Sequence, residues 1–182
     1  LRSLEESLER LNLDRIDIAL IHDPDDHYQQ AINESFPTLA ELRSQGVVGA
    51  IGAGMNQWQA LNRFASEGDF DCFLLAGRYT LLDQSGFDEL LPLCHDKGIS
   101  VILGGPYNSG VLASDLGSDT TYFYLQTPPE VLNRARRIKT ICDRYSVPLK
   151  AAALQFGLAH PTVCATIPGS SSPAEVNENV LM

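Results

Sequence analysis

The chain has 182 residues and a formal net charge of −10, because 23 aspartate and glutamate residues outnumber 13 lysine and arginine residues. Hydrophobic residues make up 44% of the sequence, which is enough for a packed core and argues against disorder. The acidic charge argues against nucleic acid as a partner, and no apolar run approaches the roughly 20 residues of a membrane span, which argues against a membrane partner.

Four cysteines lie far apart, at Cys72, Cys94, Cys142 and Cys164. They form no Cys-x-x-Cys pair and have no histidine at ligand spacing, so the sequence predicts no metal site. This usage is typical of reduced thiols, and no secretory or transit segment is visible, so we expect a cytoplasmic protein. The first residue is Leu1, already inside a predicted helix, and this indicates a fragment.

Short apolar runs alternate with amphipathic helical patterns along the chain. Helical periodicity over residues 4–11 is followed by a predicted strand at 16–21, a helix at 32–43, a strand at 47–52, a helix at 58–65, a strand at 71–76, a helix at 87–97 and a strand at 99–104. A polar and aromatic stretch, 107–127, precedes predicted helices at 129–142 and 148–160, a strand at 163–167 and a helix from 173.

Apolar strands that alternate with helices indicate a parallel sheet buried on both faces. Two α/β folds fit: an open doubly wound sheet and a (β/α)8 TIM barrel. The spacing of Gly49, Gly52 and Gly54 does not match the fingerprint of a doubly wound nucleotide domain, whereas strands that recur every 25–30 residues or so fit a barrel. Because a whole barrel needs about 250 residues, we expect a single domain, 1–182, that is an incomplete barrel of about strands 4 to 8.

Polar residues and glycines follow each predicted strand. The segments are 22–23, 54–56, 77–79, 105–109 and 168–170. Since barrels place their chemistry at the carboxyl ends of the strands, we expect these segments to surround a pocket with His22 pointing into it.

Several ordered motifs resemble the aldo-keto reductase family. They are 17–24 (DIALIHDP), 39–56 (LAELRSQGVVGAIGAGMN), 79–83 (YTLLD), and 167–170 (IPGS) with Glu178 and Asn179. Segments 105–112 (GPYNSGVL) and 151–156 (AAALQF) are similar to the branch with aldose and pyridoxal dehydrogenases. The resemblance covers the whole chain and implies that about three N-terminal βα units are missing, which makes the chain the C-terminal part of such a barrel.

The resemblance implies an NAD(P)-dependent dehydrogenase that transfers a hydride between the nicotinamide and the C1 hydroxyl or carbonyl of an aldose, or of a similar aldehyde or alcohol. In the family a Tyr acts as general acid/base beside a Lys and an Asp, and a His binds the substrate oxygen. Only the His maps onto this chain, as catalytic His22. Lys97, Lys139 and Lys150 lie in or beside helices and do not substitute. We therefore expect the fragment alone to be inactive, and a noncatalytic nucleotide-binding or interaction module is the alternative.

The resemblance also implies a cofactor site. Asn56 matches the family's carboxamide-binding Asn after a shift of one residue, with a helix N-cap as the alternative. Where the family has a Gln that binds the carboxamide, this chain has Ala76. Where the family has an aromatic ring that stacks on the nicotinamide, this chain has Gly104, so we expect the ring of Tyr107 to take over this contact. The loop 106–110 is interpreted as a cradle for the pyrophosphate. The expected cofactor-binding residues are Asn56, Pro106, Tyr107, Asn108, Ser109, Gly110, Pro168, Gly169, Ser170, Glu175, Glu178 and Asn179.

NADP-specific relatives place a Lys after the Pro and an Arg six residues later, where this chain has Gly169 and Glu175. A carboxylate repels a 2′-phosphate but accepts a hydrogen bond from a ribose 2′-hydroxyl. The sequence therefore favours NAD, while the serines 170–172 at a helix N-terminus leave NADP open.

Asp23, Tyr122 and Tyr124 are the candidate substrate residues. Aromatic faces in the insert 115–126 suit the C–H surface of a sugar, although such a cluster can equally pin a loop. Asp23 could accept hydrogen bonds from sugar hydroxyls, and the alternative is that it belongs to a solvated turn. A small molecule is the expected partner, and the sequence does not indicate an oligomeric state.

Overall fold

The computed structural model describes residues 2–117 and 119–182. Five parallel strands form its main sheet: β1 (Ile16–His22), β2 (Val48–Met55), β3 (Cys72–Ala76), β4 (Ser100–Gly104) and β7 (Val163–Ile167). They are hydrogen-bonded in the order β1-β2-β3-β4-β7, so each strand joins the same side of the one before it. This succession is that of a barrel, since a doubly wound sheet reverses its strand order.

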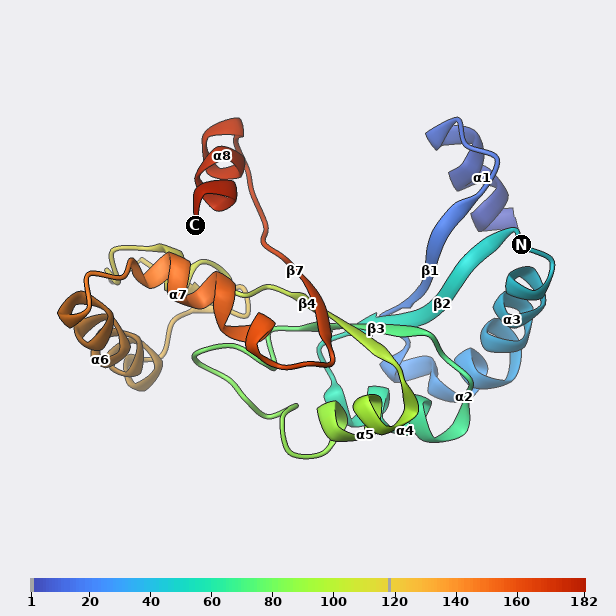
Figure 1. The fold of residues 1–182 in the computed structure, drawn as a ribbon, viewed down its shortest axis with the longest axis horizontal. Coiled ribbons are helices and arrows are strands. Elements are labelled where there is room, and N and C mark those ends of the chain that lie inside the picture. Colours follow the sequence, from blue (N-terminus) through green and yellow to red (C-terminus); the bar gives the residue numbers. More distant parts are fainter. Residues whose placement is uncertain (1, 118) are drawn as a thin grey trace.

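Helices connect these strands, and their bounds are α1 (Arg2–Leu11), α2 (Tyr28–Gln30), α3 (Phe36–Ser44), α4 (Trp58–Glu67), α5 (Leu90–Lys97), α6 (Pro129–Arg144), α7 (Leu149–Phe156) and α8 (Pro173–Leu181). Shorter turns are η1 (Asp25–His27), the π-helical η2 (Ala31–Ser35), η3 (Val111–Ala113) and η4 (Gly157–Ala159), and a small hairpin pairs β5 (Thr121–Tyr122) with β6 (Leu125–Gln126). Figure 1 shows the sheet curved like a trough, with α3, α4 and α5 on its outer side.

The predicted elements agree with the structure, with a few differences at their ends. The helix expected at 32–43 is divided into η2 and α3, and the helix expected from Phe87 begins at Leu90. The predicted end of this helix at residue 97 is confirmed. Gly98 follows with a left-handed φ of +71°, and its N–H bonds back to the last turn of α5. None of the helices described is long and apolar enough to cross a membrane.

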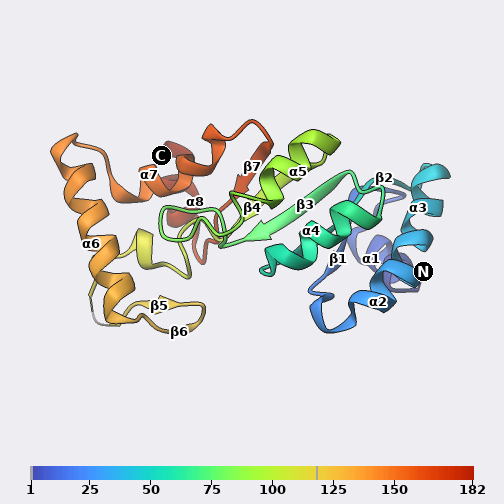
Figure 2. The ribbon, with the colours of Figure 1, turned by 90° about the horizontal axis from the view of Figure 1, so that it is seen from below.

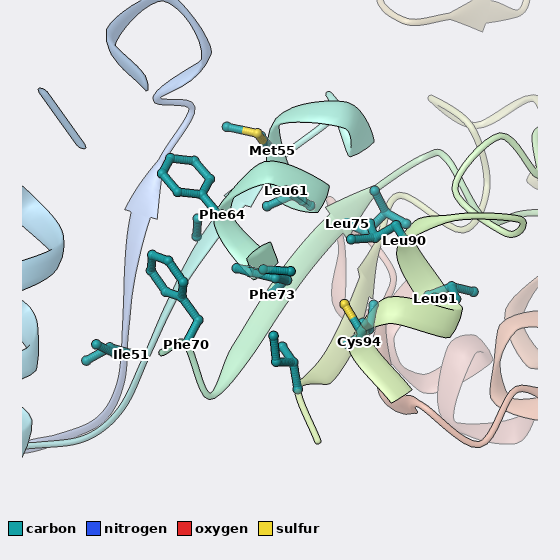
Figure 3. Packing of buried hydrophobic residues seen from close by; sticks show 14 of the residues in the cluster. Ile51, Met55, Leu61, Phe64, Phe70, Phe73, Leu75, Leu90, Leu91 and Cys94 are labelled. Carbon is teal, nitrogen blue, oxygen red and sulfur yellow. The ribbon is translucent and has the colours of Figure 1, made fainter. Parts of the chain in front are cut away.

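The main core lies between the sheet and helices α4 and α5 (Figure 3). The largest fully buried side chains there are Ile51, Met55, Leu61, Phe64, Phe73, Leu75, Leu90 and Leu91. Burial of each such side chain stabilises the fold by about 1.5–3 kcal/mol. A second cluster, which includes Val111, Leu112, Leu132 and Leu149, packs α6 and α7 against the loop after β4. Figure 2 shows these two helices on the same side of the molecule as this loop.

The expectation of strands buried on both faces is wrong for the two edge strands. Ile18 in β1 is 44% exposed and Ile167 in β7 is 52% exposed, whereas most residues of β2, β3 and β4 are buried. The sheet is open, with β1 and β7 as its edges. Edge strands lack a neighbour on one side, which is why their inner faces are not covered.

Gly52 in β2 has a packing role. A Cβ atom at this position would lie 1.9 Å from the backbone oxygen of Cys72 on β3. The glycine therefore permits close pairing of two adjacent strands.

Candidate functional site

A cavity of about 780 Å³ lies at the carboxyl ends of β3 and β4 and reaches α8. All the predicted cofactor-binding residues except Pro168 and Asn179 line it, from four separate segments. Those that line it are Asn56, Pro106, Tyr107, Asn108, Ser109, Gly110, Gly169, Ser170, Glu175 and Glu178, and the candidate substrate residue Tyr124 lines it as well.

The loop after β4 has an unusual backbone. Asn108, Ser109 and Gly110 take consecutive positive φ angles of 48°, 56° and 98°. At the two non-glycine residues this conformation costs about 1 kcal/mol each. Thr121 Oγ1 donates a hydrogen bond to the backbone oxygen of Ser109 at 3.0 Å, which holds the loop from outside. The N–H groups of Asn108 and Gly110 already donate to the backbone oxygens of Gly105 and Tyr107. Of these three residues in the described chain, Ser109 alone keeps an N–H without such a bond, and this N–H is the donor that the loop can offer to an anion.

Asn108 is buried at the base of this loop. One of its amide hydrogens is used, because Nδ2 donates to the backbone oxygen of Gly77 at 3.3 Å. Its Oδ1 is buried and has no hydrogen-bond partner. An unsatisfied buried acceptor costs about 1–3 kcal/mol. The side chain therefore offers an acceptor for a ligand hydroxyl or amide.

Tyr107 connects the same loop to α8. Its hydroxyl donates to Asn179 Oδ1 at 2.8 Å, and Asn179 Nδ2 donates to Ser170 Oγ at 2.9 Å. Burial, together with the nearby Glu178 carboxylate, raises the pKa of Tyr107 to about 12. The phenol is therefore neutral and anchored, and Asn179 supports the cavity wall from behind it.

The N-terminus of α8 is capped by its own side chains. Ser172 is the N-cap, and its Oγ accepts from the Glu175 N–H at 3.3 Å. Glu175 Oε2 accepts from the Ser171 N–H at 2.6 Å, and Ser171 Oγ donates to the same carboxylate. These bonds to Ser171 lower the pKa of Glu175. The carboxylate thus occupies the helix end at which an anion would otherwise bind.

Lys150 also lines the cavity, although the sequence pattern places it in a helix without a role. Its Nζ lies 2.6 Å from Glu178 Oε2, and its side chain is 13% exposed. The signal that identifies it is a single charge at the start of the otherwise apolar segment 149–154 (LKAAAL), where no solvated face is available.

Asn56 lies where β2 ends, but it does not cap the next helix. The N-cap of α4 is Gln57, so the alternative interpretation of Asn56 as an N-cap is wrong. Its Nδ2 instead donates to the backbone oxygen of Ala76 at 2.9 Å. Its backbone oxygen accepts from Arg78 Nε at 3.3 Å. The side chain joins the ends of β2 and β3 at the cavity wall.

Phe123 lines the cavity and Arg78 lies against it, and the sequence assigned neither of them an individual role. Arg78 belongs to the strand-end segment 77–79 and Phe123 to the aromatic insert 115–126. Arg78 pairs with Asp83 at 2.9 Å, and its guanidinium lies 4.3 Å from the centroid of the Phe123 ring. Burial raises the pKa of Asp83, but hydrogen bonds from Ser85 and Arg78 outweigh it and lower that pKa overall. The arginine after a strand and the central aromatic of segment 122–124 are the only sequence signals for this contact.

The structure does not bring His22 to the cavity. His22 is the last residue of edge strand β1, its side chain is 88% exposed, and Nε2 lies 3.6 Å from Asp23 Oδ2. The expectation that it points into the pocket is wrong for the residues described, because β2 separates β1 from the strands around the cavity. Asp23 and Tyr122 also lie outside the cavity lining, and Phe123 takes the place expected for Tyr122.

Comparisons with known proteins identify relatives of this chain. A sequence profile of the aldo/keto reductase family matches residues 1–182. The chain is 39% identical to pyridoxal 4-dehydrogenase from Microbacterium luteolum, covering 100% of this chain and 56% of the relative. It is 43% identical to D-threo-aldose 1-dehydrogenase from a Pseudomonas species, covering 97% and 54%. The chain thus spans about half the length of these curated relatives.

A solved structure shows the same fold. The holo form of an aldo-keto reductase from Bacillus halodurans matches 99% of this chain and 59% of its own, with a TM-score of 0.78 and 25% identity. The prediction of a partial α/β barrel is confirmed by this match, and the predicted family by the profile.

Proposed function

The chain belongs to the aldo/keto reductase family, and from this we propose that the protein is an NAD-dependent dehydrogenase. Its proposed substrate is an aldose or a similar small hydroxylated molecule, oxidised at a C1 hydroxyl or formed by reduction of the corresponding carbonyl. The similarity to an aldose dehydrogenase and a pyridoxal dehydrogenase supports this substrate class. The separated free cysteines fit a reducing compartment, so we propose the cytoplasm as its location.

The observation that carries the proposal is the cavity wall formed by the loop after β4 and the start of α8. A Cβ at Gly110 or at Gly169 would meet nothing within 4 Å, so the backbone there is open to a ligand. The left-handed loop offers the Ser109 N–H, and Asn108 offers a buried acceptor. These features fit a dinucleotide, whose pyrophosphate needs donors and whose ribose hydroxyls need acceptors.

The bound nicotinamide would supply the hydride acceptor. The residues of this chain would bind and orient it: the loop 106–110 at the pyrophosphate, and Ser170 and Glu175 at the adenosine ribose. Asn56 is proposed at the carboxamide. His22 lies outside the cavity, but β1 pairs it with Gly54 and so ends at the same edge of the sheet; its proposed role is at the substrate oxygen, beyond the cofactor cavity.

Proton transfer is not assigned to Tyr107, the buried tyrosine of the cavity. Burial raises the pKa of Tyr107 to about 12, which makes it a poor general acid/base near neutral pH. We therefore propose that these residues supply cofactor binding, and that this chain by itself does not turn over substrate.

NAD is the proposed cofactor. Gly169 provides no cation for a 2′-phosphate, and the Glu175 carboxylate is fixed at the N-terminus of α8 by Ser171. Like charges at short range disfavour the extra phosphate of NADP, whereas a carboxylate can accept from a 2′-hydroxyl.

The test is a turnover assay on the complete protein that contains these residues. A panel of aldoses, pyridoxal, aldehydes and simple alcohols is incubated with NAD or NADP, and absorbance of the reduced cofactor is followed. We expect reduction of NAD with aldoses. Absence of turnover with every substrate would remove the dehydrogenase proposal, and a strong preference for NADP would remove the cofactor assignment.

One observation favours the alternative, a noncatalytic nucleotide-binding or interaction module. His22 is exposed and lies outside the cavity, so the described site binds without presenting a reactive group. A module would bind NAD in equilibrium dialysis and would reduce none of it with any member of the panel.

A further inference from the structure

Lys150 is the one cationic side chain among the described residues that line the cavity. It lies near the start of α7, and the contact with Glu178 joins α7 to α8. Its ammonium also lies 5.6 Å from the centroid of the Tyr107 ring. With 13% of the side chain exposed, this lysine has lost most of its water and depends on the Glu178 carboxylate for charge compensation.

Two carboxylates face this single ammonium. Glu178 pairs with it directly, and Glu175 lines the same cavity. One positive and two negative side chains give this end of the cavity a formal charge of −1. A phosphate dianion needs positive charge or several free donors to leave water, and Lys150 is already engaged.

Resting on the proposed dehydrogenase function, we propose that the Lys150–Glu178 ion pair determines cofactor specificity. Glu178 cancels the charge of Lys150, so the adenosine end of the cavity accepts a ribose 2′-hydroxyl and rejects a 2′-phosphate. Lys150 can therefore bind a phosphate only when Glu178 is uncharged, because the carboxylate otherwise pairs with its ammonium.

The chemistry of lysine supports this role. Its ammonium is a compact charge on a flexible stem with three donors, so it can turn from one anion to another. Ser170 on the same wall can add a hydroxyl donor to a phosphate, because its Oγ accepts from Asn179 and leaves its own hydrogen free to donate. The net charge of the site has the largest effect on phosphate binding, because electrostatic interactions are stronger in a partly buried site than in water.

The variant that separates charge from packing is Glu178→Gln. A glutamine keeps the length of the side chain and an oxygen that can accept from Lys150, so the contact between α7 and α8 is retained. The hydrogen bond between Tyr107 and Asn179, and the one from Gln155 to the backbone oxygen of Met182, also fasten α8.

The experiment measures binding by calorimetry on the complete protein, with 5′-AMP and adenosine 2′,5′-bisphosphate as probes. For E178Q we expect the affinity for the bisphosphate relative to 5′-AMP to rise about tenfold. The gain should decline as salt is raised, because screening weakens it. The double variant K150M/E178Q, which lacks both charges, should return the ratio to its original value.

Asp143→Asn is the matched control. Asp143 pairs with Lys139 on α6 at 2.8 Å, outside the cavity lining, so the substitution makes the same change in net charge without changing the ratio. K150M alone should lower bisphosphate affinity more than 5′-AMP affinity, and this variant decides the matter if E178Q does not fold.

Two results overturn the inference in distinguishable ways. If 5′-AMP binds and the ratio is the same in E178Q as in the unmodified protein, the ion pair does not set specificity, while the proposed function stands. If the unmodified protein binds neither probe and neither dinucleotide, the proposed function and this inference both fail.

Discussion

The guanidinium of Arg78 lies 4.3 Å from the centroid of the Phe123 ring, which joins the end of β3 to the β5–β6 hairpin. Asp83 fixes the guanidinium from another side at 2.9 Å, and Arg78 Nε donates to the backbone oxygen of Asn56. The ring therefore rests on a cation that is held in place. The hairpin is kept at the rim of the cavity by this stack.

Phe123→Ala should loosen the hairpin. Loss of a cation–π contact of this kind lowers the free energy of unfolding by about 0.5–1 kcal/mol. Urea unfolding measures that loss, and limited proteolysis should show faster cleavage in 119–127. Leu125→Ala is the matched control, because Leu125 is 73% exposed on the same hairpin. Equal losses in both variants would show that the stack does not hold the hairpin.

Tyr124→Asn should stabilise the protein while weakening substrate binding. Phe123 and Tyr124 form the two-residue turn at positive φ angles of 48° and 64°, a conformation that favours Asn and Gly. Relief of this strain is worth up to about 1 kcal/mol in the free energy of unfolding. Tyr124 is 91% exposed and lines the cavity, so its loss should raise KM for an aldose in the complete protein.

A thermal unfolding scan and a KM measurement separate the two effects. Tyr122→Asn is the comparison, because Tyr122 packs edge-on against Phe123 and lies outside the cavity lining. That variant should lose stability and leave KM unchanged. An unchanged KM in Y124N would argue against a substrate contact.

Most of the fold could be predicted because it depends on local patterns. The strand at 163–167 has the predicted bounds, and the helix stop at Gly98 is a property of one glycine. The sequence does not determine which strands lie at an edge, since Ile18 and Ile51 look equally apolar although one is 44% exposed and the other buried. A strand lies at an edge when no other strand pairs with it on one side, and this is not a property of its own residues.

The site was predicted less completely, for a physical reason. Residues 106–110 and 169–170 follow strands directly, so the topology alone brings them together. Lys150 and Phe123 reach the cavity from a helix start and a hairpin. Their local sequence signals do not specify the tertiary contacts that place them there. His22 also follows a strand directly, but β2 lies between its strand and the strands at the cavity, so its position at a strand end does not bring it there.

Gly52→Ala should disrupt the sheet. The added Cβ would lie 1.9 Å from the backbone oxygen of Cys72, so β2 and β3 must separate. We expect a loss of more than about 3 kcal/mol in the free energy of unfolding, or failure to fold. Gly46→Ala is the comparison: a Cβ there meets nothing within 4 Å, and its cost, about 1 kcal/mol, comes from φ alone. Similar losses would contradict the close approach at Gly52.

Glu175→Gln should remove an acid-sensitive part of the stability. Hydrogen bonds from Ser171 lower the pKa of Glu175 in the folded chain below its ordinary value of 4.5. A group with a depressed folded pKa stabilises the fold above its unfolded pKa, and that contribution is lost as pH falls through the folded value. The Tm difference between the unmodified protein and E175Q should therefore be largest near neutral pH and decline below about pH 4.5. Glu130→Gln, in the first turn of α6, reports the general effect of a lost helix-start charge. A Tm difference that is constant from pH 7 to 3, or equal in the two variants, would show that Ser171 does not hold the carboxylate.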